Sequence, residues 1–296
     1  MIDVHVHVVH DHVHDHDHDP GNKPMNPGHD DSVLDLRPDE LAARVREQMK
    51  VAGITTIFGM GMRSAPADDP LGINGTLRLA TLVPGLKAIG VADPARTGTD
   101  HLKKAEEQLN AGKGKVVALK AYLGYVHQGP DSPGYVPYFR LAAKYNLPFF
   151  FHTGDTWATK AKVRFAHPLL VDDVAVDHPD VNFVLAHMGN PWLTDAAEVV
   201  FKNENVWADL SGLVVGDENA LKLQADGTIT PDTYLADLAH DLRRAFRYTE
   251  KPERFLYGSD WPLVPMAAYK KLIEAVVPKE HHEAVFLTNA KKLFKL

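Results

Sequence analysis

The chain has 296 residues and a formal net charge of −7, with 45% hydrophobic residues, 24% charged residues and no cysteine. This composition is ordinary for a globular protein, and length alone allows one large domain or two small ones. The acidic balance, without a Lys/Arg cluster interleaved with aromatic residues, argues against nucleic acid as a partner.

No apolar run approaches the ~18 residues of a membrane span, and the N-terminus lacks the basic stretch and apolar block of a signal peptide. We therefore expect a cytoplasmic protein with no membrane partner. The lack of cysteine excludes disulfides and a cysteine nucleophile. Any metal site must then use His, Asp, Glu or a modified Lys.

Short runs rich in Val, Ile and Phe alternate with longer amphipathic segments, a pattern typical of βαβ units around a parallel sheet. Eight runs predict strands, at residues 2–8, 54–62, 87–93, 116–124, 147–154, 181–189, 206–212 and 254–262. Between them, the clearest helical patterns lie at residues 37–53, 97–114, 230–249 and 279–294. Pro38 stands early in the first of these helices, and Gly53 stands at its expected end.

Eight strand–helix units in slightly under 300 residues predict a single-domain (β/α)8 (TIM) barrel over residues 1–296. The main alternative is a doubly wound open sheet, but no Gly-rich phosphate turn follows the first strand. No composition shift, linker or internal repeat divides the chain. In a barrel, the reacting side chains are expected at the carboxyl ends of the strands.

The first predicted strand, IDVHVHV, carries apolar residues at even positions and Asp3, His5 and His7 at odd positions. Because strand side chains alternate between faces, His5 and His7 should project together, about 6.5 to 7 Å apart along the strand. That spacing allows both imidazoles to bind one metal ion. An exposed polar face would show the same pattern.

Other predicted strands also contain or end in a residue that can bind metal or move protons: Lys120, His152, His187 and Asp260. Each has a structural alternative, since buried histidines are usually hydrogen-bonded, an aspartate can cap a turn and a buried lysine needs a partner. Their recurrence at equivalent places in successive units favours one shared site. Neutral imidazoles with one carboxylate leave a position on zinc open for water, whose pKa then falls toward ~7.

The ordered segments DVHVH, FFFHTG, LAHMG, YGSDWP and TNAKKLF resemble the amidohydrolase superfamily. Within it, the chain is most similar to the amidohydrolase-related (amidohydrolase 2) group of metal-dependent (β/α)8 barrels, which holds hydrolases and non-oxidative decarboxylases. The resemblance spans nearly the whole chain. It implies a divalent metal, with zinc as the leading expectation and manganese or another divalent ion as the alternative.

The resemblance also implies roles for individual residues. His5, His7, His152 and Asp260 would be the metal ligands, and Asp260 would double as the proton shuttle. His187 would orient or deprotonate the metal-bound water, or meet the substrate.

Lys120 raises the question of a second metal, because some superfamily members carry a carboxylated strand-four lysine that bridges two ions. Lys120 precedes the apparent end of its strand by several residues, so we favour a mononuclear site with Lys120 and Tyr122 facing the substrate. Arg63 could pair with a substrate carboxylate, and Trp261 could form a wall of the pocket. Further candidates for the pocket lining are Asp93, His127 and Asp209.

The leading functional hypothesis is a metal-dependent hydrolase, in which metal-bound hydroxide attacks a carbonyl carbon of an amide, lactone or ester. Asp260 would pass the proton to the leaving group. The nearest alternative is a non-oxidative decarboxylase with the same ligands, in which protonated Asp260 or His187 delivers a proton to carbon. In both cases the partner is a small-molecule substrate set by the loops at the barrel mouth, and homo-oligomer formation is left open.

A His/Asp-rich tract at about residues 9–31 follows the first strand. Its histidines His10, His12, His14, His16 and His18 are even-numbered, so in one continuous strand they would face away from His5 and His7. We expect a loop over the barrel mouth, acting as a secondary metal site or lid, with a solvated polar loop as the alternative. The hypothesis of another class is a metal-storage or metal-delivery protein that works through this tract.

Overall fold

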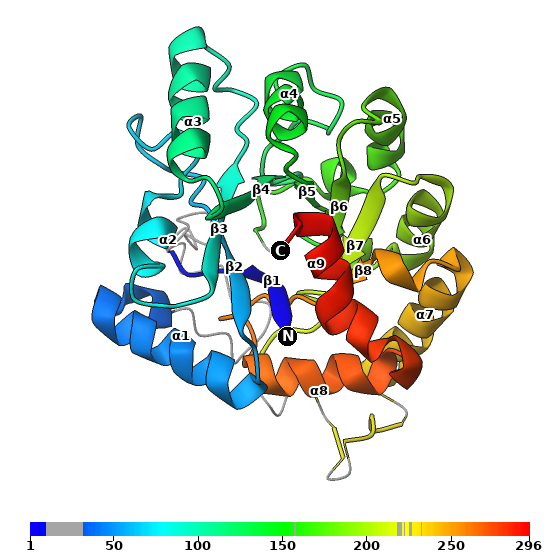
Figure 1. Ribbon diagram of the computed structural model, residues 1–296. Helices are drawn as coiled ribbons and strands as arrows, with labels where there is room; N and C mark the ends of the chain where they lie inside the picture. The colour runs from blue at the N-terminus through cyan, green and yellow to red at the C-terminus, as the bar shows by residue number, and fades with distance from the viewer. Residues whose placement is uncertain (10–31, 157, 218–220, 222, 225–226, 232) are drawn as a thin grey trace.

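In the computed structural model, eight parallel strands form one sheet whose order follows the chain. All residues are described except 10–31, 157, 218–220, 222, 225–226 and 232. The strands are β1 (Ile2–Val6), β2 (Thr56–Met60), β3 (Leu86–Val91), β4 (Val116–Ala121), β5 (Phe149–His152), β6 (Phe183–Ala186), β7 (Val206–Asp209) and β8 (Phe255–Leu256). Each of the predicted strands is present and shorter than the run that predicted it. Figure 1 shows the strands surrounded by helices.

The main helices are α1 (Pro38–Ala52), α2 (Asn74–Leu79), α3 (Thr99–Ala111), α4 (Val136–Tyr145), α5 (Leu170–Asp177), α6 (Leu193–Lys202), α7 (Tyr234–Thr249), α8 (Met266–Val276) and α9 (Asn289–Phe294). Short helical turns complete the described elements: η2 (Ser32–Asp35), η3 (Val163–Ala166), η4 (His187–Gly189), η5 (Pro252–Arg254), η6 (Lys279–His281) and η7 (Ala284–Thr288). The helices predicted at 37–53, 97–114 and 230–249 are α1, α3 and α7. Gly53 ends α1 in the left-handed region, with φ of 71°.

Backbone hydrogen bonds join β1 to the segment that follows β8. The amide of Val4 donates to the Tyr257 carbonyl at 3.0 Å, and the amide of Asp260 donates to the His5 carbonyl at 2.8 Å. These bonds bring the first and last strands together, which confirms the single-domain (β/α)8 barrel and excludes the open doubly wound sheet.

β1 contains an irregularity that changes which side chains face inward. Asp3 pairs with Ile57 and Val6 pairs with Gly59, so three steps along β1 match two steps along β2. An extra residue of this kind is a β-bulge, which reverses the alternation of faces beyond it.

The bulge divides the valine-rich face that the sequence predicted. Ile2 and Val4 pack inside the barrel, whereas Val6 and Val8 pack in the cluster that includes the helices. The prediction of one continuous even-numbered face is therefore wrong. The two imidazoles beyond the bulge still lie together, with ring centroids 5.7 Å apart.

At the end of the barrel nearest α9, the interior is filled by apolar side chains, which we call the apolar layer. They are Ile2, Val4, Phe58, Met60, Ile89, Val117, Ala118, Phe150, Val184, Trp207 and Leu256. Helix α9 adds Ala290, Leu293 and Phe294 to it, and the Phe294 ring meets that of Phe58 edge-on, with the centroids 4.7 Å apart. Figure 1 shows α9 lying across this end of the barrel. Helix α9 therefore covers one end of the barrel interior.

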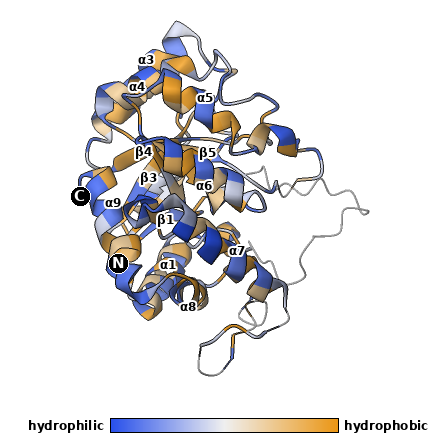
Figure 2. Ribbon diagram, turned by 90° about the vertical axis from the view of Figure 1, so that its right-hand side faces the viewer, coloured by the Kyte–Doolittle hydropathy of each residue, from blue (hydrophilic) through white to orange (hydrophobic). Residues whose placement is uncertain are grey.

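The outer helices bury one face against the strands. Figure 2 shows hydrophilic and hydrophobic segments alternating along α1, α7 and α8, as expected for amphipathic helices. Among the described residues, no helix is both long and apolar enough to cross a bilayer.

Candidate active site

Polar side chains fill the barrel immediately above the apolar layer, and we call this set the polar layer. Two residues beyond Ala118, Phe150 and Trp207, the inward face carries Lys120, His152 and Asp209, respectively. They are joined by His5 and His7 from the end of β1, and by His187 and Asp260, which lie just past β6 and β8. All of these side chains are buried. The residues that the sequence proposed as ligands lie together at one end of the barrel, although Asp260 lies beyond β8 rather than on it.

Three donor atoms converge at the centre of this layer. His5 Nε2 and His7 Nε2 lie 3.4 Å and 3.3 Å from Asp260 Oδ1, and each ligand atom of the three residues is within 4.8 Å of the others. Asp260 Oδ1 is buried and has no hydrogen-bond partner among the described residues. A buried carboxylate oxygen between two imidazole nitrogens is a donor set that fits a divalent cation.

A second group, His5, His187 and Asp209, is equally close. Its members satisfy one another, since His5 Nδ1 donates to Asp209 Oδ2 at 2.9 Å and the His187 amide donates to Asp209 Oδ1 at 3.0 Å. His5 thus takes part in both groups through different nitrogens. The group that contains Asp260 is the better cation site, because Asp260 Oδ1 has no hydrogen-bond partner among the described residues, whereas both oxygens of Asp209 accept hydrogen bonds.

The charge states of these groups suit metal binding. Burial, together with the nearby Lys120 ammonium, lowers the pKa of His5 to about 3, so this imidazole is neutral at neutral pH. Burial acts to raise the pKa of Asp260, but His5, His7 and His187 outweigh it and hold this pKa well below its ordinary value. A neutral imidazole and an ionised carboxylate are the forms that bind metal.

Lys120 lies at the end of its strand, contrary to the interpretation from the sequence. The predicted strand 116–124 is too long, because β4 ends at Ala121. Lys120 Nζ lies 2.8 Å from His5 Nε2 and 4.6 Å from the centroid of the Tyr122 ring. A neutral imidazole has one lone pair at Nε2, so this nitrogen can accept a hydrogen bond from Lys120 or bind a cation, but not both.

His152 ends β5 beside His187. Its Nε2 donates to the Asp155 carbonyl at 2.8 Å, and its Nδ1 lies 3.2 Å from His187 Nε2. Burial, His187 and Lys120 hold the pKa of His152 well below its ordinary value, so the ring is neutral. Neither nitrogen belongs to the group formed with Asp260, and the ligand role of His152 stays a prediction.

Of the residues predicted to contact substrate, Arg63 and Tyr122 line a cavity, whereas Trp261 lies in the core. A cavity of about 280 Å3 is lined by Arg63, Ser64, Val91, Ala92, Asp93, Tyr122 and Val126. The guanidinium of Arg63 lies 5.4 Å from the centroid of the Tyr122 ring. Trp261, in contrast, is buried in the core cluster, and His127 is exposed, with Nε2 3.0 Å from the Lys160 carbonyl.

One residue of the polar layer was not identified from the sequence. Ser211 lies two residues beyond β7, with its Oγ 3.0 Å from His5 Nδ1 and 2.9 Å from His187 Nδ1. Asp209 was expected only to line the pocket, yet it lies between the same two histidines. A serine after a strand is common in loops, so its residue type gave no signal.

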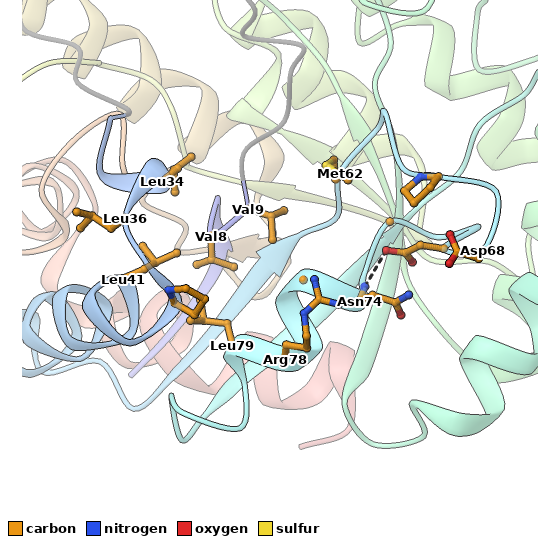
Figure 3. Close-up of a pocket in the computed structure, with 15 residues that line it drawn as sticks. Val8, Val9, Leu34, Leu36, Leu41, Met62, Asp68, Asn74, Arg78 and Leu79 are labelled. Atoms are coloured by element: carbon orange, nitrogen blue, oxygen red, sulfur yellow. Dashed lines mark hydrogen bonds between the residues drawn. The ribbon is translucent and has the colours of Figure 1, made fainter.

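A larger cavity, of about 460 Å3, lies beside this site on the helical side of β1 and β2. It is lined by Val8, Val9, Leu34, Leu36, Pro38, Leu41, Met62, Pro66, Asp68, Asp69, Gly72, Asn74, Gly75, Arg78 and Leu79. Figure 3 shows Leu34, Leu36 and Leu41 on one side of it and Asp68 and Asn74 on the other. The lining contains no member of the buried polar layer, so the chemistry does not belong to this cavity.

The tract with His10, His12, His14, His16 and His18 lies outside the described residues. The loop over the mouth and the secondary metal site therefore stay predictions.

Comparison with known proteins assigns the chain to a family. Residues 2–296 match the family described as Amidohydrolase, whereas no curated protein matches the sequence. Among solved structures, the chain resembles an uncharacterised TIM-barrel protein from Bordetella bronchiseptica, with a TM-score of 0.69 and 17% identity over 100% of this chain and 98% of that one.

Two further structures show the same fold. A probable 2-pyrone-4,6-dicarboxylic acid hydrolase from Acinetobacter baumannii has a TM-score of 0.60 and 16% identity, covering 100% of this chain and 99% of its own. A 5-carboxyvanillate decarboxylase from Novosphingobium aromaticivorans, solved with manganese and 4-hydroxy-3-methoxy-5-nitrobenzoic acid, has a TM-score of 0.57 and 14% identity, covering 86% and 80%. With the family match extending over residues 2–296, this chain is an enzyme of the amidohydrolase family.

Proposed function

We propose that this enzyme is a metal-dependent hydrolase that cleaves an amide, lactone or ester bond in a small organic molecule. The observation that carries the proposal is the Asp260 carboxylate. It is buried and ionised, and its Oδ1 lies between two imidazole nitrogens without a hydrogen-bond partner among the described residues. An ionised carboxylate in this position can accept a proton from water, which is what hydrolysis requires of it.

His5, His7 and Asp260 would hold a divalent cation, with His152 as a further ligand. Such a cation supplies Lewis acidity, which lowers the pKa of water and polarises a carbonyl group. Zinc is the leading candidate because imidazole-rich sites suit it, and manganese is the alternative that the decarboxylase from Novosphingobium aromaticivorans suggests.

The surrounding residues would divide the remaining work. Asp260 would take the proton from the attacking water and pass it to the leaving group. His187, whose Nδ1 lies 3.9 Å from Asp260 Oδ2, would orient the water or contact the substrate. Lys120 and Arg63 would supply positive charge to a substrate oxygen or carboxylate at the mouth.

A decarboxylase is the second candidate, and two observations favour it. Lys120 and Arg63 place two cationic groups near Tyr122, which suits an aromatic carboxylate. In addition, a structural neighbour of this fold is a decarboxylase of such a compound.

The two candidates are separated by their products. The chelator-treated enzyme, reloaded with zinc or manganese, would be incubated in 18O-labelled water with a panel of lactones, esters and amides and a panel of aromatic carboxylates. We expect one 18O atom in the product acid, no activity without metal, and a loss of at least about a thousandfold in kcat/KM for Asp260→Asn. Release of CO2 without 18O incorporation would reject the hydrolase in favour of the decarboxylase.

A further inference from the structure

The end of β7 contacts several members of the polar layer through Asp209. Asp209 uses both carboxylate oxygens. Oδ2 accepts from His5 Nδ1 at 2.9 Å, and Oδ1 accepts from the amides of His187 and Ser211 at 3.0 Å and 2.9 Å and from the Ser211 hydroxyl. Asp209 and Ser211 are both fully buried. Hydrogen bonds enclosed in this way fix orientation strongly, because no water competes for them.

These contacts fix where the proton of His5 lies. A carboxylate oxygen can only accept, so the contact with Asp209 requires a hydrogen on His5 Nδ1. In a neutral imidazole, Nε2 then carries the lone pair. That nitrogen is the one that faces His7 and Asp260, so Asp209 sets the tautomer that can bind a cation.

The same segment holds His187. The Ser211 carbonyl lies 3.1 Å from His187 Nδ1, and the Ser211 hydroxyl lies 2.9 Å from it. A carbonyl can only accept, which favours a hydrogen on this nitrogen. The backbone of His187 has φ of 60°, a value that side-chain-bearing residues rarely adopt, and its amide is held by Asp209 Oδ1.

Gly212 completes the contact surface. Its φ is 59°, and a Cβ atom there would lie 2.6 Å from His187 Nδ1 and 2.7 Å from Asp260 Oδ2. Only glycine therefore lets the chain pass this close to both side chains.

We propose that the segment Asp209–Gly212 is a positioning element that sets the proton position of His5, and through it the cation affinity of the site, and that holds the His187 ring in place. Asp209 and Ser211 are positioning residues, since they act through the two histidines and are not themselves placed as ligands. This inference rests on the proposed metal-dependent function.

The test compares the parent with Asp209→Asn, Ser211→Ala and a control, Asp69→Asn. Asp69 is also buried, but it accepts from Ile73, Asn74 and Gln108, none of which belongs to the polar layer. Zn2+ and Mn2+ affinities are measured by competition with a chromophoric chelator. The tautomers are read by 15N NMR of the metal-free protein with labelled histidine rings, and the His5 signals are identified by their loss in His5→Gln.

We expect the parent His5 to carry its hydrogen on Nδ1. In Asp209→Asn the amide can donate to Nδ1, which moves the ring hydrogen to Nε2 and weakens cation binding by about 10- to 100-fold. Ser211→Ala should change the His187 ring signals with a smaller loss of affinity, and Asp69→Asn should bind cations as the parent does.

Two results would overturn the proposal: cation affinity as tight in Asp209→Asn as in the parent, or a parent His5 that carries its hydrogen on Nε2. If Asp209→Asn does not fold, Ser211→Ala and the parent spectrum still decide the question. If the parent binds neither cation, the proposed metal-dependent function fails, and with it the affinity effect, whereas the tautomers in the metal-free protein remain a separate measurement.

Discussion

His5 makes strong contacts through both of its ring nitrogens, and they have different consequences. At Nδ1 the partner is Asp209, whereas at Nε2 the Lys120 ammonium lies 2.8 Å away. A cation that binds Nε2 must displace the Lys120 hydrogen bond and tolerate the nearby positive charge. Lys120 is therefore a competitor of the cation as well as a candidate substrate contact.

Replacement of this lysine gives a prediction at the residue scale. Lys120→Met should tighten Zn2+ or Mn2+ binding about fivefold or more, because removing a repulsion of about 1 kcal/mol has that effect on a dissociation constant. The measurement is chelator competition at constant pH. Lys144→Met, which removes an exposed lysine paired with Glu106, is the matched control. Weaker binding in Lys120→Met would instead identify Lys120 as a ligand, as expected of a carboxylated lysine that bridges two ions.

Polar residues that interrupt an apolar run could be identified as candidate site residues from the sequence alone. Lys120 and His152 follow buried residues in short strands, and a polar group there needs a reason. Ser211 could not be predicted in this way, because its partners His5 and His187 are distant in the chain. Which nitrogen of His5 faces the cation depends on Asp209, and this too needed the structure.

At the scale of the elements, β1 shows where the pattern of the sequence was misleading. Its residues alternate regularly, yet the bulge between Asp3 and Val6 reverses the alternation. The bulge depends on pairing with β2, so no local pattern announces it. It allows Ile2 and Val4 to fill the apolar layer while His5 and His7 reach the site on the same interior face. The existence and order of the strands, in contrast, followed from short apolar runs.

The contact between α3 and α4 gives a prediction about pH. His101 Nε2 lies 3.0 Å from the Tyr138 hydroxyl, which donates to the Arg96 carbonyl, so the imidazole donates to the hydroxyl oxygen. Burial, followed by the charge of Arg96, lowers the pKa of His101 below its ordinary 6.5. The unfolded chain therefore takes up a proton more readily than the folded one as the pH falls through this range.

The sign of the effect follows from that difference. His101 stabilises the fold above pH 6.5, and this contribution is lost as the pH falls toward the lowered pKa. His101→Gln keeps a donor but does not titrate, so its free energy of unfolding should fall less than that of the parent between about pH 7.5 and pH 5.5. Urea unfolding at both pH values measures this, and equal losses in the two proteins would contradict it.

At the scale of the whole molecule, the barrel interior is built in two layers. The apolar layer is closed by α9, and the polar layer lies above it at the open mouth. The Phe294 ring contacts that of Phe58 and stacks on that of Phe150 with the centroids 6.1 Å apart. The last helix therefore holds together strands that are far from it in sequence.

Loss of this contact should destabilise the whole fold. We expect Phe294→Ala to lower the free energy of unfolding by about 3 to 5 kcal/mol, the usual range for a buried phenylalanine. Phe201→Ala, at a side chain that is 44% exposed, should lower it by less than about 1 kcal/mol. Urea unfolding of chelator-treated proteins measures both. Similar losses in the two variants would mean that α9 does not hold the barrel closed.

The two layers also bear on how this protein could evolve. The contacts that hold the strands together involve Phe58, Phe150 and their apolar neighbours, whereas the reacting groups belong to a different level of the same barrel. A substitution among the reacting groups leaves the contacts of the apolar layer intact, so each variant along a series of single substitutions can still fold. A lineage could in this way exchange one reaction for another by successive small steps.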